Sequence, residues 1–327
     1  MCSIFIFICL DSLLFTGIII GGLFYAIDAA SGFGGFVTHV FSDGLVSSIA
    51  DSYNIGILIF MVILGTMVAL MNKAGGSAAF GNWAKKHIKS KVGAQCATVL
   101  LGILIFIDDY FNCLTVGSVM KPVTDKYGVS RTKLAYLIDA TAAPVCIIAP
   151  VSSWAAAVAA FAEDGQGLNL FIKAIPYNYY AILTIVMMVS ITLLGVDYGP
   201  MAKFERNAKT KGDLFSGKNT FVSTTATTPN ANGKVIDLIL PIVVLITSCI
   251  IGMIYSGGFF SDADVDFATA FSNSDASIGL ALGSIAALII TIVFYLCRRV
   301  LSFKKCMDCI PDGFKQMVPA ILILTFA

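Results

Sequence analysis

Long apolar segments alternate with short polar ones along the whole of this 327-residue chain. The eight apolar segments cover residues 4–26, 53–72, 92–120, 134–162, 174–196, 235–256, 277–297 and 316 onward. Most have about the length of an α-helix of 20 residues, which crosses the roughly 30 Å hydrocarbon core of a bilayer. The pattern predicts an all-α polytopic membrane protein. The last segment reaches only about half of that length, so we expect the chain to be part of a longer protein.

The loops between these segments sort by charge. Four of them hold 20 of the 21 Lys and Arg residues, namely 73–91, 121–133, 197–234 and 298–315. The other loops carry mainly Asp and Glu. Basic loops of membrane proteins lie in the cytoplasm, so the charges predict that these four loops are cytoplasmic and that the acidic loops lie on the far side.

Residues 92–120 have a basic loop at each end, which a single crossing of the membrane does not explain. A re-entrant hairpin that enters from the cytoplasm and returns satisfies the charge rule, with its tip near the sequence IDDYFN at 107–112. Irregular backbone at membrane depth occurs where it is buried in protein or lines a watery cavity. The alternative is that 92–120 crosses the membrane and 134–162 is the re-entrant segment, and both topologies remain open.

The segment 134–162 is too long for one straight span. At a rise of 1.5 Å per residue it would extend about 43 Å, well beyond the roughly 30 Å hydrocarbon core. Pro144 and Pro150 predict breaks, because each proline removes a backbone donor and frees a carbonyl. The segment is therefore expected to be a broken helix, of the kind that forms cation sites in secondary transporters.

The polar, Ser/Thr/Gly-rich stretch within 197–234 divides the chain. We expect a first transmembrane bundle over 1–196, a cytoplasmic polar loop over 197–234, and the start of a second transmembrane bundle over 235–327.

Composition excludes several classes of protein. Hydrophobic residues make up 57% of the chain and charged residues 13%, whereas ordinary globular chains contain about 25% charged residues. A net charge of +1, without a basic stripe interleaved with aromatics, indicates no nucleic-acid partner. The single CxxC of Cys306 and Cys309 is a weak metal signal. The apolar segments contain no HExxH or GxSxG motif, so we do not expect an enzyme.

Two adjacent acids, Asp108 and Asp109, lie inside the apolar segment 92–120. An ionised carboxylate at mid-membrane costs roughly 2.5 to 3.5 kcal/mol, and such residues usually mark ion paths. On a helix, Asn112 would neighbour both acids, and Thr115 would extend the same face. A structural explanation is that the two aspartates cap the halves of the hairpin.

The broken helix offers a second group of oxygen-bearing side chains: Asp139, Thr141, Ser152 and Ser153. Carboxylate, amide and hydroxyl oxygens suit a hard cation. A buried pair of carboxylates holds either a cation or protons, because two bare charges cannot both remain desolvated at close range. Competition at such a site, with access alternating between the two sides, gives exchange.

The same stretches resemble a known family. GGSAAFGNWAKKHIKSKVGAQ at 75–95, IDDYFN, DATAAP at 139–144 and PVSSW at 150–154 are similar to the signature of bacterial NhaC-type sodium/proton antiporters, within the ion-transporter superfamily. The resemblance is strong over about 70–154 and looser elsewhere. It implies a multi-pass secondary transporter of the bacterial cytoplasmic membrane, built from two inverted repeats that each contain a re-entrant hairpin and a broken helix.

Carried over by position, the resemblance implies ion or substrate handling by seven residues: Asp108, Asp109, Asn112, Asp139, Thr141, Ser152 and Ser153. The helix face adds Thr115 to the predicted site, and Asp108, Asp109 and Asp139 are the candidates for Na⁺ binding. The family has further spans and a complete second repeat, much of which this sequence lacks.

The sequence therefore predicts exchange of Na⁺ for H⁺, with small inorganic cations and the lipid bilayer as partners and with no cofactor. A homodimer is left open. The alternative is an ion-coupled exchanger of amino acids or carboxylates, to which some members of the family are assigned. No apolar segment contains a deep basic residue that would hold an anion, which favours the cation. A passive channel would instead offer a ring of equivalent groups or a constriction.

Overall fold

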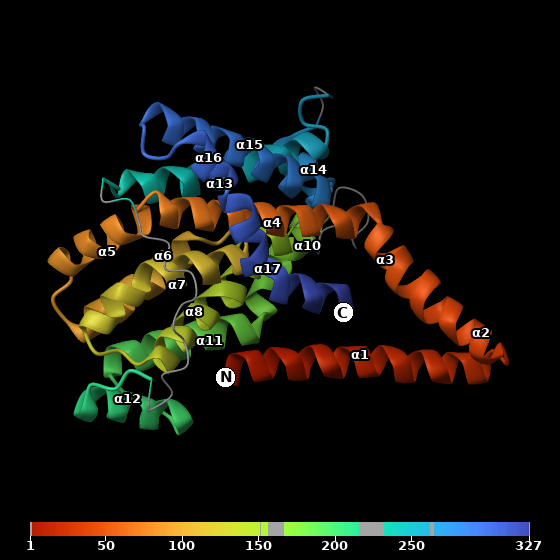
Figure 1. Ribbon diagram of the computed structural model, residues 1–327, viewed down its shortest axis with the longest axis horizontal. Helices are drawn as coiled ribbons and strands as arrows, with labels where there is room; N and C mark the ends of the chain where they lie inside the picture. Colours follow the sequence, from red (N-terminus) through yellow and green to blue (C-terminus); the bar gives the residue numbers. More distant parts are fainter. Residues whose placement is uncertain are drawn as a thin grey trace.

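A computed structural model describes residues 2–150, 152–155, 167–215, 230, 232–261 and 265–326, and in this part every regular element is a helix (Figure 1). The first half contains α1 (Cys2–Asp28), α2 (Gly32–Val37), η1 (Thr38–Val46), α3 (Ser47–Ala50), α4 (Ser52–Lys73), α5 (Gly76–His87), α6 (Lys91–Leu104), α7 (Asp109–Lys126) and α8 (Arg131–Cys146). The second half contains α10 (Gly167–Ala174), η2 (Ile175–Tyr177), α11 (Tyr179–Leu194), α12 (Gly199–Lys211), α13 (Ile236–Ser256), α14 (Phe267–Ser272), α15 (Ala276–Cys297), α16 (Phe303–Met307) and α17 (Cys309–Phe326).

Four stretches of the described chain are long and apolar enough to cross a membrane. They are α4, α13, α15 and the stretch Tyr179–Lys211, which includes α11 and α12. Together with the all-helical architecture, they confirm the prediction of a polytopic helical membrane protein. The predicted inverted repeats and the division into two bundles stay predictions.

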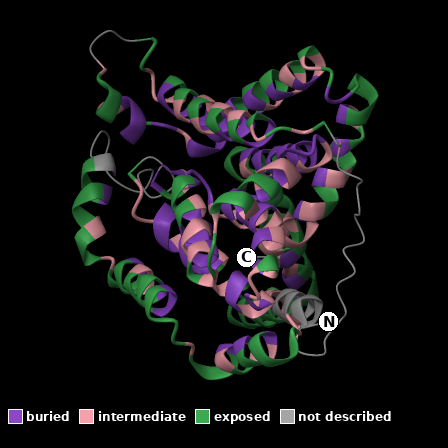
Figure 2. Ribbon diagram, turned by 90° about the vertical axis from the view of Figure 1, so that its left-hand side faces the viewer, coloured by how far each residue is buried: buried purple, intermediate pink, exposed green. Residues whose placement is uncertain are grey.

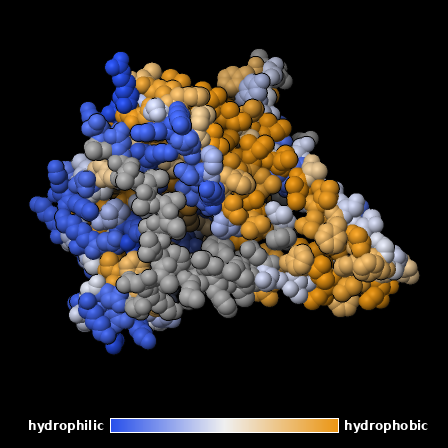
Figure 3. All heavy atoms as spheres, in the orientation of Figure 1, coloured by the Kyte–Doolittle hydropathy of each residue, from blue (hydrophilic) through white to orange (hydrophobic). Residues whose placement is uncertain are grey.

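The four basic loops meet at one end of the molecule. The ammonium of Lys126 donates to the carbonyl of Lys85 at 2.8 Å, and the N–H of Arg131 donates to the carbonyl of Leu214 at 3.1 Å. Asn230 links the remaining loops, since its side-chain amide donates to the carbonyl of Val300 at 2.6 Å. Figure 3 shows hydrophilic residues gathered at this end, on the left, and mainly hydrophobic residues in the upper middle and on the right. The charge pattern thus identified one side of the fold.

Residues 92–120 form a helical hairpin. α6 ends at Leu104, four residues without helix follow, and α7 begins at Asp109. Both outer ends of the hairpin lie at the basic end of the molecule, where the hydroxyl of Tyr127 donates to the carbonyl of Ile88. This geometry agrees with the first of the two topologies, and the tip lies at IDDYFN as predicted. The re-entrant position of the hairpin in a bilayer stays a prediction.

The predicted broken helix is interrupted at one place instead of two. α8 begins after its N-cap Ser130, contains Pro144, and ends at Cys146. The prediction that Pro144 breaks the helix was wrong: it lies in the last turn, and the next turn still closes with the N–H of Ile147 donating to the carbonyl of Ala143 at 3.0 Å. The described residues of the break are 147–150 and 152, and Pro150 is one of them. Residues 156–162 of the predicted segment lie outside the described residues.

Two other predicted segments differ from the structure at their starts. Residues 174–178 are not part of α11, because Asn178 caps that helix by accepting the N–H of Ala181 at 3.2 Å. α17 begins at Cys309, seven residues before the apolar run at 316, because a polar first turn is compatible with a helix end outside the membrane.

α4 forms the centre of the fold. It packs against α15, α17 and α7, and Phe60, Leu64, Met67 and Leu70 of α4 are almost completely buried. Figure 2 shows buried residues concentrated inside the body and exposed residues on the outer helices.

At the opposite end from the basic loops, α1 and the run from α2 to α3 form an arm beside the body (Figure 1).

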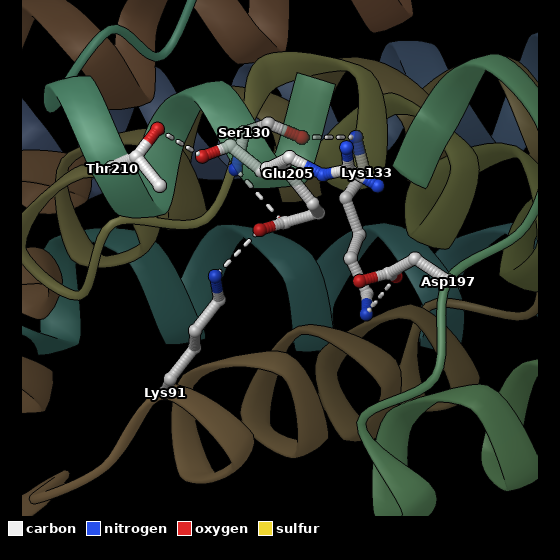
Figure 4. Close-up of polar contacts among 7 residues, drawn as sticks. Lys91, Ser130, Lys133, Asp197, Glu205 and Thr210 are labelled. Atoms are coloured by element: carbon white, nitrogen blue, oxygen red, sulfur yellow. Dashed lines mark hydrogen bonds and ion pairs between the residues drawn. The ribbon is translucent and has the colours of Figure 1, made fainter. Parts of the chain in front are cut away.

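A set of ion pairs, here called the clasp, holds the segment 197–205 on the bases of α6 and α8 (Figure 4). The carboxylate of Glu205 accepts from the ammonium of Lys91 at 2.5 Å and from the N–H of Ser130 at 3.0 Å. Lys133, fully buried, pairs with Asp197 at 2.6 Å. The clasp therefore joins the basic ends of α6 and α8, the two helices that end at the interruptions near 105–108 and after Cys146.

Candidate functional site

The two helix interruptions, one at the tip of the hairpin and one after α8, are hydrogen-bonded to each other. The N–H of Ser153, after the break that follows α8, donates to the carbonyl of Ile107, at the tip of the hairpin, at 2.8 Å. α6 and α8 also approach each other closely at Gly102 and Thr141. A side chain at Gly102 would collide with Thr141. Only a glycine permits this contact. The local sequence of both segments therefore brings two pieces of irregular backbone together.

Asp108 lies at this junction and is only 5% exposed. One carboxylate oxygen accepts the N–H of Phe111 at 2.9 Å and caps α7, which confirms the structural explanation for this residue. The other oxygen accepts a hydrogen bond from the hydroxyl of Ser153 at 3.3 Å. A single carboxylate thus serves as helix cap and as the link between the two breaks.

Asp109 lies in the first turn of α7 and is partly exposed. It lines a cavity of about 570 Å³, here called the aspartate cavity. Polar side chains in its wall are Ser48, Tyr53, Asn54, Asp108, Asp109, Tyr110, Ser153 and Thr325, and Trp154 lies beside them. Ser48 and Ile49 of α3 also line it, so the cavity lies where the arm joins the body. It gives an ion or a small solute access to both acids.

Asn112 and Thr115 form a second, closed group of oxygens within the hairpin. Both side chains are fully buried. The amide of Asn112 donates to the carbonyls of Gly102 at 2.6 Å and Ile105 at 2.9 Å, which fixes its orientation. The side-chain oxygens of Asn112 and Thr115 have no hydrogen-bond partner among the described residues. An unpaired buried polar atom costs about 1–3 kcal/mol, and a bound ion or water would remove this cost.

The remaining predicted residues play different parts. The hydroxyl of Thr141 donates to the carbonyl of Leu137 at 2.8 Å. The hydroxyl of Ser152 donates to the carbonyl of Cys146 at 2.7 Å and accepts the N–H of Ala155 at 3.1 Å, so it stabilises the break itself. Asp139 is exposed on α8 and is not part of the cavity wall. The structure thus brings Asp108, Asp109 and Ser153 together and leaves Asp139 apart.

Most of the residues that line the aspartate cavity were not predicted from the sequence, and Tyr53, Asn54 and Trp154 are three of them. Tyr53 and Asn54 begin α4, more than 50 residues before the aspartates, and no local pattern connects them with the hairpin. Trp154 directly follows the two serines in PVSSW, and its position in that motif was a usable signal. Only the packing of α4 against α7 brings the first two residues to the cavity.

The fold and these residues define a class: a multi-pass helical membrane protein with a buried acid at paired helix breaks. Residues 166–327 match the sequence model of the Na⁺/H⁺ antiporter family. The matched part is thus similar to a family of transporters. It does not overlap the stretch 70–154 that carries the NhaC-type resemblance.

A protein of Haemophilus influenzae, described as an uncharacterized protein, is 34% identical to this chain over 303 residues. The aligned part covers 89% of this chain and 56% of the relative, so the chain spans little more than half the length of that relative. No solved structure matches the chain.

Proposed function

We propose that the protein containing this chain exchanges Na⁺ for H⁺ across the bacterial cytoplasmic membrane, as a transporter of the NhaC type. The observation that carries the proposal is the position of the Asp108 carboxylate. It is buried where the two helix interruptions meet, and it borders the aspartate cavity. The family match over 166–327 supports antiport of a cation and protons.

The site residues would act through charge balance. Asp108 and Asp109 supply carboxylate oxygens, and Ser153 supplies a hydroxyl oxygen that reaches Asp108. A hard monovalent cation suits such ligands. When the cation leaves, a proton taken up by a carboxylate replaces its charge, because a bare charge pair in a desolvated site is costly. Cation and proton would therefore occupy the site in turn, which is the requirement for exchange.

An ion-coupled exchanger of amino acids or carboxylates is the second candidate. The size of the aspartate cavity favours it, since about 570 Å³ falls in the range of roughly 300–1,000 Å³ for small-molecule sites. Tyr53, Tyr110 and Trp154 in its wall would pack against an organic solute. A dehydrated cation needs far less space.

Proton flux in proteoliposomes distinguishes the two candidates. The full-length protein, with an imposed pH gradient, would receive pulses of Na⁺, and Asp108→Asn, Asp109→Asn and Asp139→Asn would be compared with wild type. We expect a Na⁺-driven pH change that Asp108→Asn abolishes, with an apparent Na⁺ affinity that rises with pH as protons compete less. Asp43→Asn is the matched control, because Asp43 is exposed on η1.

The proposal fails if the wild type shows no Na⁺ response but does show flux when an amino acid or hydroxy acid is added. That result would make the organic-solute exchanger the working function. Asp139→Asn separately decides whether this exposed acid takes part.

A further inference from the structure

A second cavity, of about 330 Å³, lies at the other end of the helices that form the aspartate cavity. Its wall includes Asn72, Lys73, Ser77, Ser118, Lys121 and Asp312. These residues come from the end of α4, the start of α5, the second half of α7 and the start of α17. We call it the basic-end cavity, because the basic loops 73–91, 121–133 and 298–315 begin or end beside it.

Three helices, α4, α7 and α17, line both cavities, and the distance between the cavities is the same along each. On α4 the aspartate cavity reaches Met61 and the basic-end cavity starts at Ala69. On α7 the corresponding residues are Tyr110 and Ser118, and α17 runs the opposite way with Leu324 and Gln316. Each pair is eight residues apart, which corresponds to about 12 Å at a rise of 1.5 Å per residue.

A barrier of about 12 Å is thin beside the roughly 30 Å hydrocarbon core that a membrane protein must cross. Along these three helices, little more than two helical turns separate the cavities. The charges of the loops give the two ends their sides: the basic-end cavity faces the cytoplasm, and the aspartate cavity faces the far side.

We propose that the two cavities are the two vestibules of one cation route, and that the contact between α4 and α17 at Gly65 and Met317 is the seal between them. This inference rests on the proposed transport function and identifies the path that the transported ion takes.

At the seal the backbone of α4 packs directly against α17, with the side chain of Met317 over Gly65 and the backbone of Gly313 at the edge nearer the basic-end cavity. A side chain at Gly65 would collide with the carbonyl of Gly313 and with Met317, and a side chain at Gly313 would collide with the backbone of Thr66. Leu64 and Met67 of α4 and Met317 of α17 are buried at the same level. An ion cannot pass this packed apolar layer unless the two helices move apart.

The third helix carries polar atoms at the level of the seal. Asn112 and Thr115 lie on α7 between the two vestibules, and their unpartnered oxygens are buried. A cation that leaves the aspartate cavity must shed water to enter a layer of this kind. Oxygens of an amide and a hydroxyl are suitable replacements for that water.

The wall of the basic-end cavity carries an excess of positive charge, which suits a passage for cations and not a binding site. Lys73 and Lys121 outnumber Asp312 in its wall. A cation is repelled by this excess of positive charge and does not rest there. The resting site is then the aspartate cavity, and the basic-end cavity connects the seal to the cytoplasm.

Cysteine accessibility in oriented vesicles tests the two vestibules. Asn54→Cys and Ser118→Cys would be introduced separately into a variant of the full-length protein whose native cysteines are replaced, and labelled with a membrane-impermeant maleimide. We expect Ser118→Cys to react from the cytoplasmic side only and Asn54→Cys from the far side only. Equal reaction from both sides, or no reaction of Ser118→Cys from the cytoplasmic side, overturns the assignment.

The seal is tested by the same label. Gly65→Ala, combined with Ser118→Cys, should allow the label to reach position 118 from the far side as well. Gly117→Ala is the matched control, because a side chain there meets only Ile138 at an ordinary 3.6 Å, and labelling should stay one-sided. Met317→Ala, which removes a buried side chain without adding a collision, keeps the test possible if Gly65→Ala does not fold.

One-sided labelling in both Gly65→Ala and Met317→Ala, with the proteins folded, would overturn the seal. Labelling does not depend on transport. A protein that shows the expected sidedness but no Na⁺/H⁺ exchange therefore retains the two vestibules and loses only the proposed cargo.

Discussion

The hydroxyl of Ser153 lies 3.3 Å from a carboxylate oxygen of Asp108, although the two residues are 45 positions apart in the chain. The backbone supports the same junction, since the N–H of Ser153 donates to the carbonyl of Ile107 at 2.8 Å. The site therefore consists of two segments, neither of which is complete alone. Its geometry depends on the relative position of the hairpin and the break after α8.

Ser153→Ala tests the side-chain half of this junction. The substitution removes the hydroxyl but keeps the backbone bond to Ile107. Hydrogen bonds to charged groups contribute about 1.5–3 kcal/mol, and a long one contributes less, so we expect about a fivefold to tenfold loss of apparent Na⁺ affinity. The measurement is the Na⁺ dependence of proton flux, with the maximal rate largely retained.

Ser284→Ala is the matched control for that substitution. Ser284 is buried in α15, and its hydroxyl donates to the carbonyl of Ala281 in its own helix at 2.9 Å. Its removal should leave the Na⁺ affinity unchanged. Equal affinities for wild type and Ser153→Ala would show that the hydroxyl is not a ligand.

Thr115→Val tests whether the buried Thr115 hydroxyl binds the cation or has no ligand role. The Thr115 hydroxyl has no partner among the described residues, so valine of similar shape should leave the protein as stable as wild type, or more stable, without Na⁺. The increase in melting temperature on adding Na⁺ should become smaller. Thermal unfolding in detergent measures both, with choline chloride in place of NaCl to hold the ionic strength.

Thr98→Val provides the comparison. This hydroxyl donates to the carbonyl of Ala94 at 2.8 Å, so its loss should lower stability by about 0.5–1.5 kcal/mol and leave the Na⁺ effect unchanged. If Thr115→Val destabilises the protein in the absence of Na⁺ and keeps the full Na⁺ effect, Thr115 is not a ligand.

Glu205→Ala tests the clasp. The carboxylate is 4% exposed and accepts from both Lys91 and Ser130. Removal of one partner of a buried pair costs about 3–5 kcal/mol, but the Lys91 side chain is 36% exposed, so we expect about 2 kcal/mol. The check is the free energy of unfolding in detergent, together with faster hydrogen exchange in α12.

Two further variants control the clasp experiment. Arg206→Ala changes an exposed neighbour on the same helix and should have little effect. Lys91→Met combined with Glu205→Leu removes both charges and should recover much of the loss, because no charge remains buried without a partner. A double variant as unstable as Glu205→Ala would contradict this explanation.

The start of α14 should be sensitive to acid. Asp266, in the acidic loop between α13 and α15, caps this helix, and hydrogen bonds from the side chain and the backbone N–H of Thr269 hold the pKa of Asp266 below its usual range. A lowered pKa means that the folded state favours the ionised form. The stabilisation is present above the ordinary carboxyl pKa of about 4 and is lost as the pH falls through the lowered value.

Hydrogen exchange of the Thr269 amide, corrected for its intrinsic rate, measures this effect. Protection should fall in wild type as the pH drops below about 4. Asp266→Asn retains a capping oxygen that does not titrate in this range, so its protection should not change with pH. The same acid response in both proteins would rule out Asp266 as its source.

The sequence by itself determined the elements and which loops gather at one end of the fold. Apolar length is a local property, so α1, α4, α13 and α15 lie where the apolar runs predicted. Charge is equally local, and the basic loops that it singled out do meet at one end of the fold. The interruption at IDDYFN and the acids beside it were also visible, because an acid in an apolar run requires a compensating structure.

Only the tertiary structure decided which of the predicted site residues meet. Ser153 reaches Asp108, whereas Asp139, an equally promising acid by sequence, is exposed on α8. Pro144 remained within its helix, and Tyr53 joined the cavity from α4. The physical reason is that the face a helix turns inward depends on its packing against distant helices, through contacts such as that of Gly102 with Thr141. Such contacts leave no local trace in the sequence.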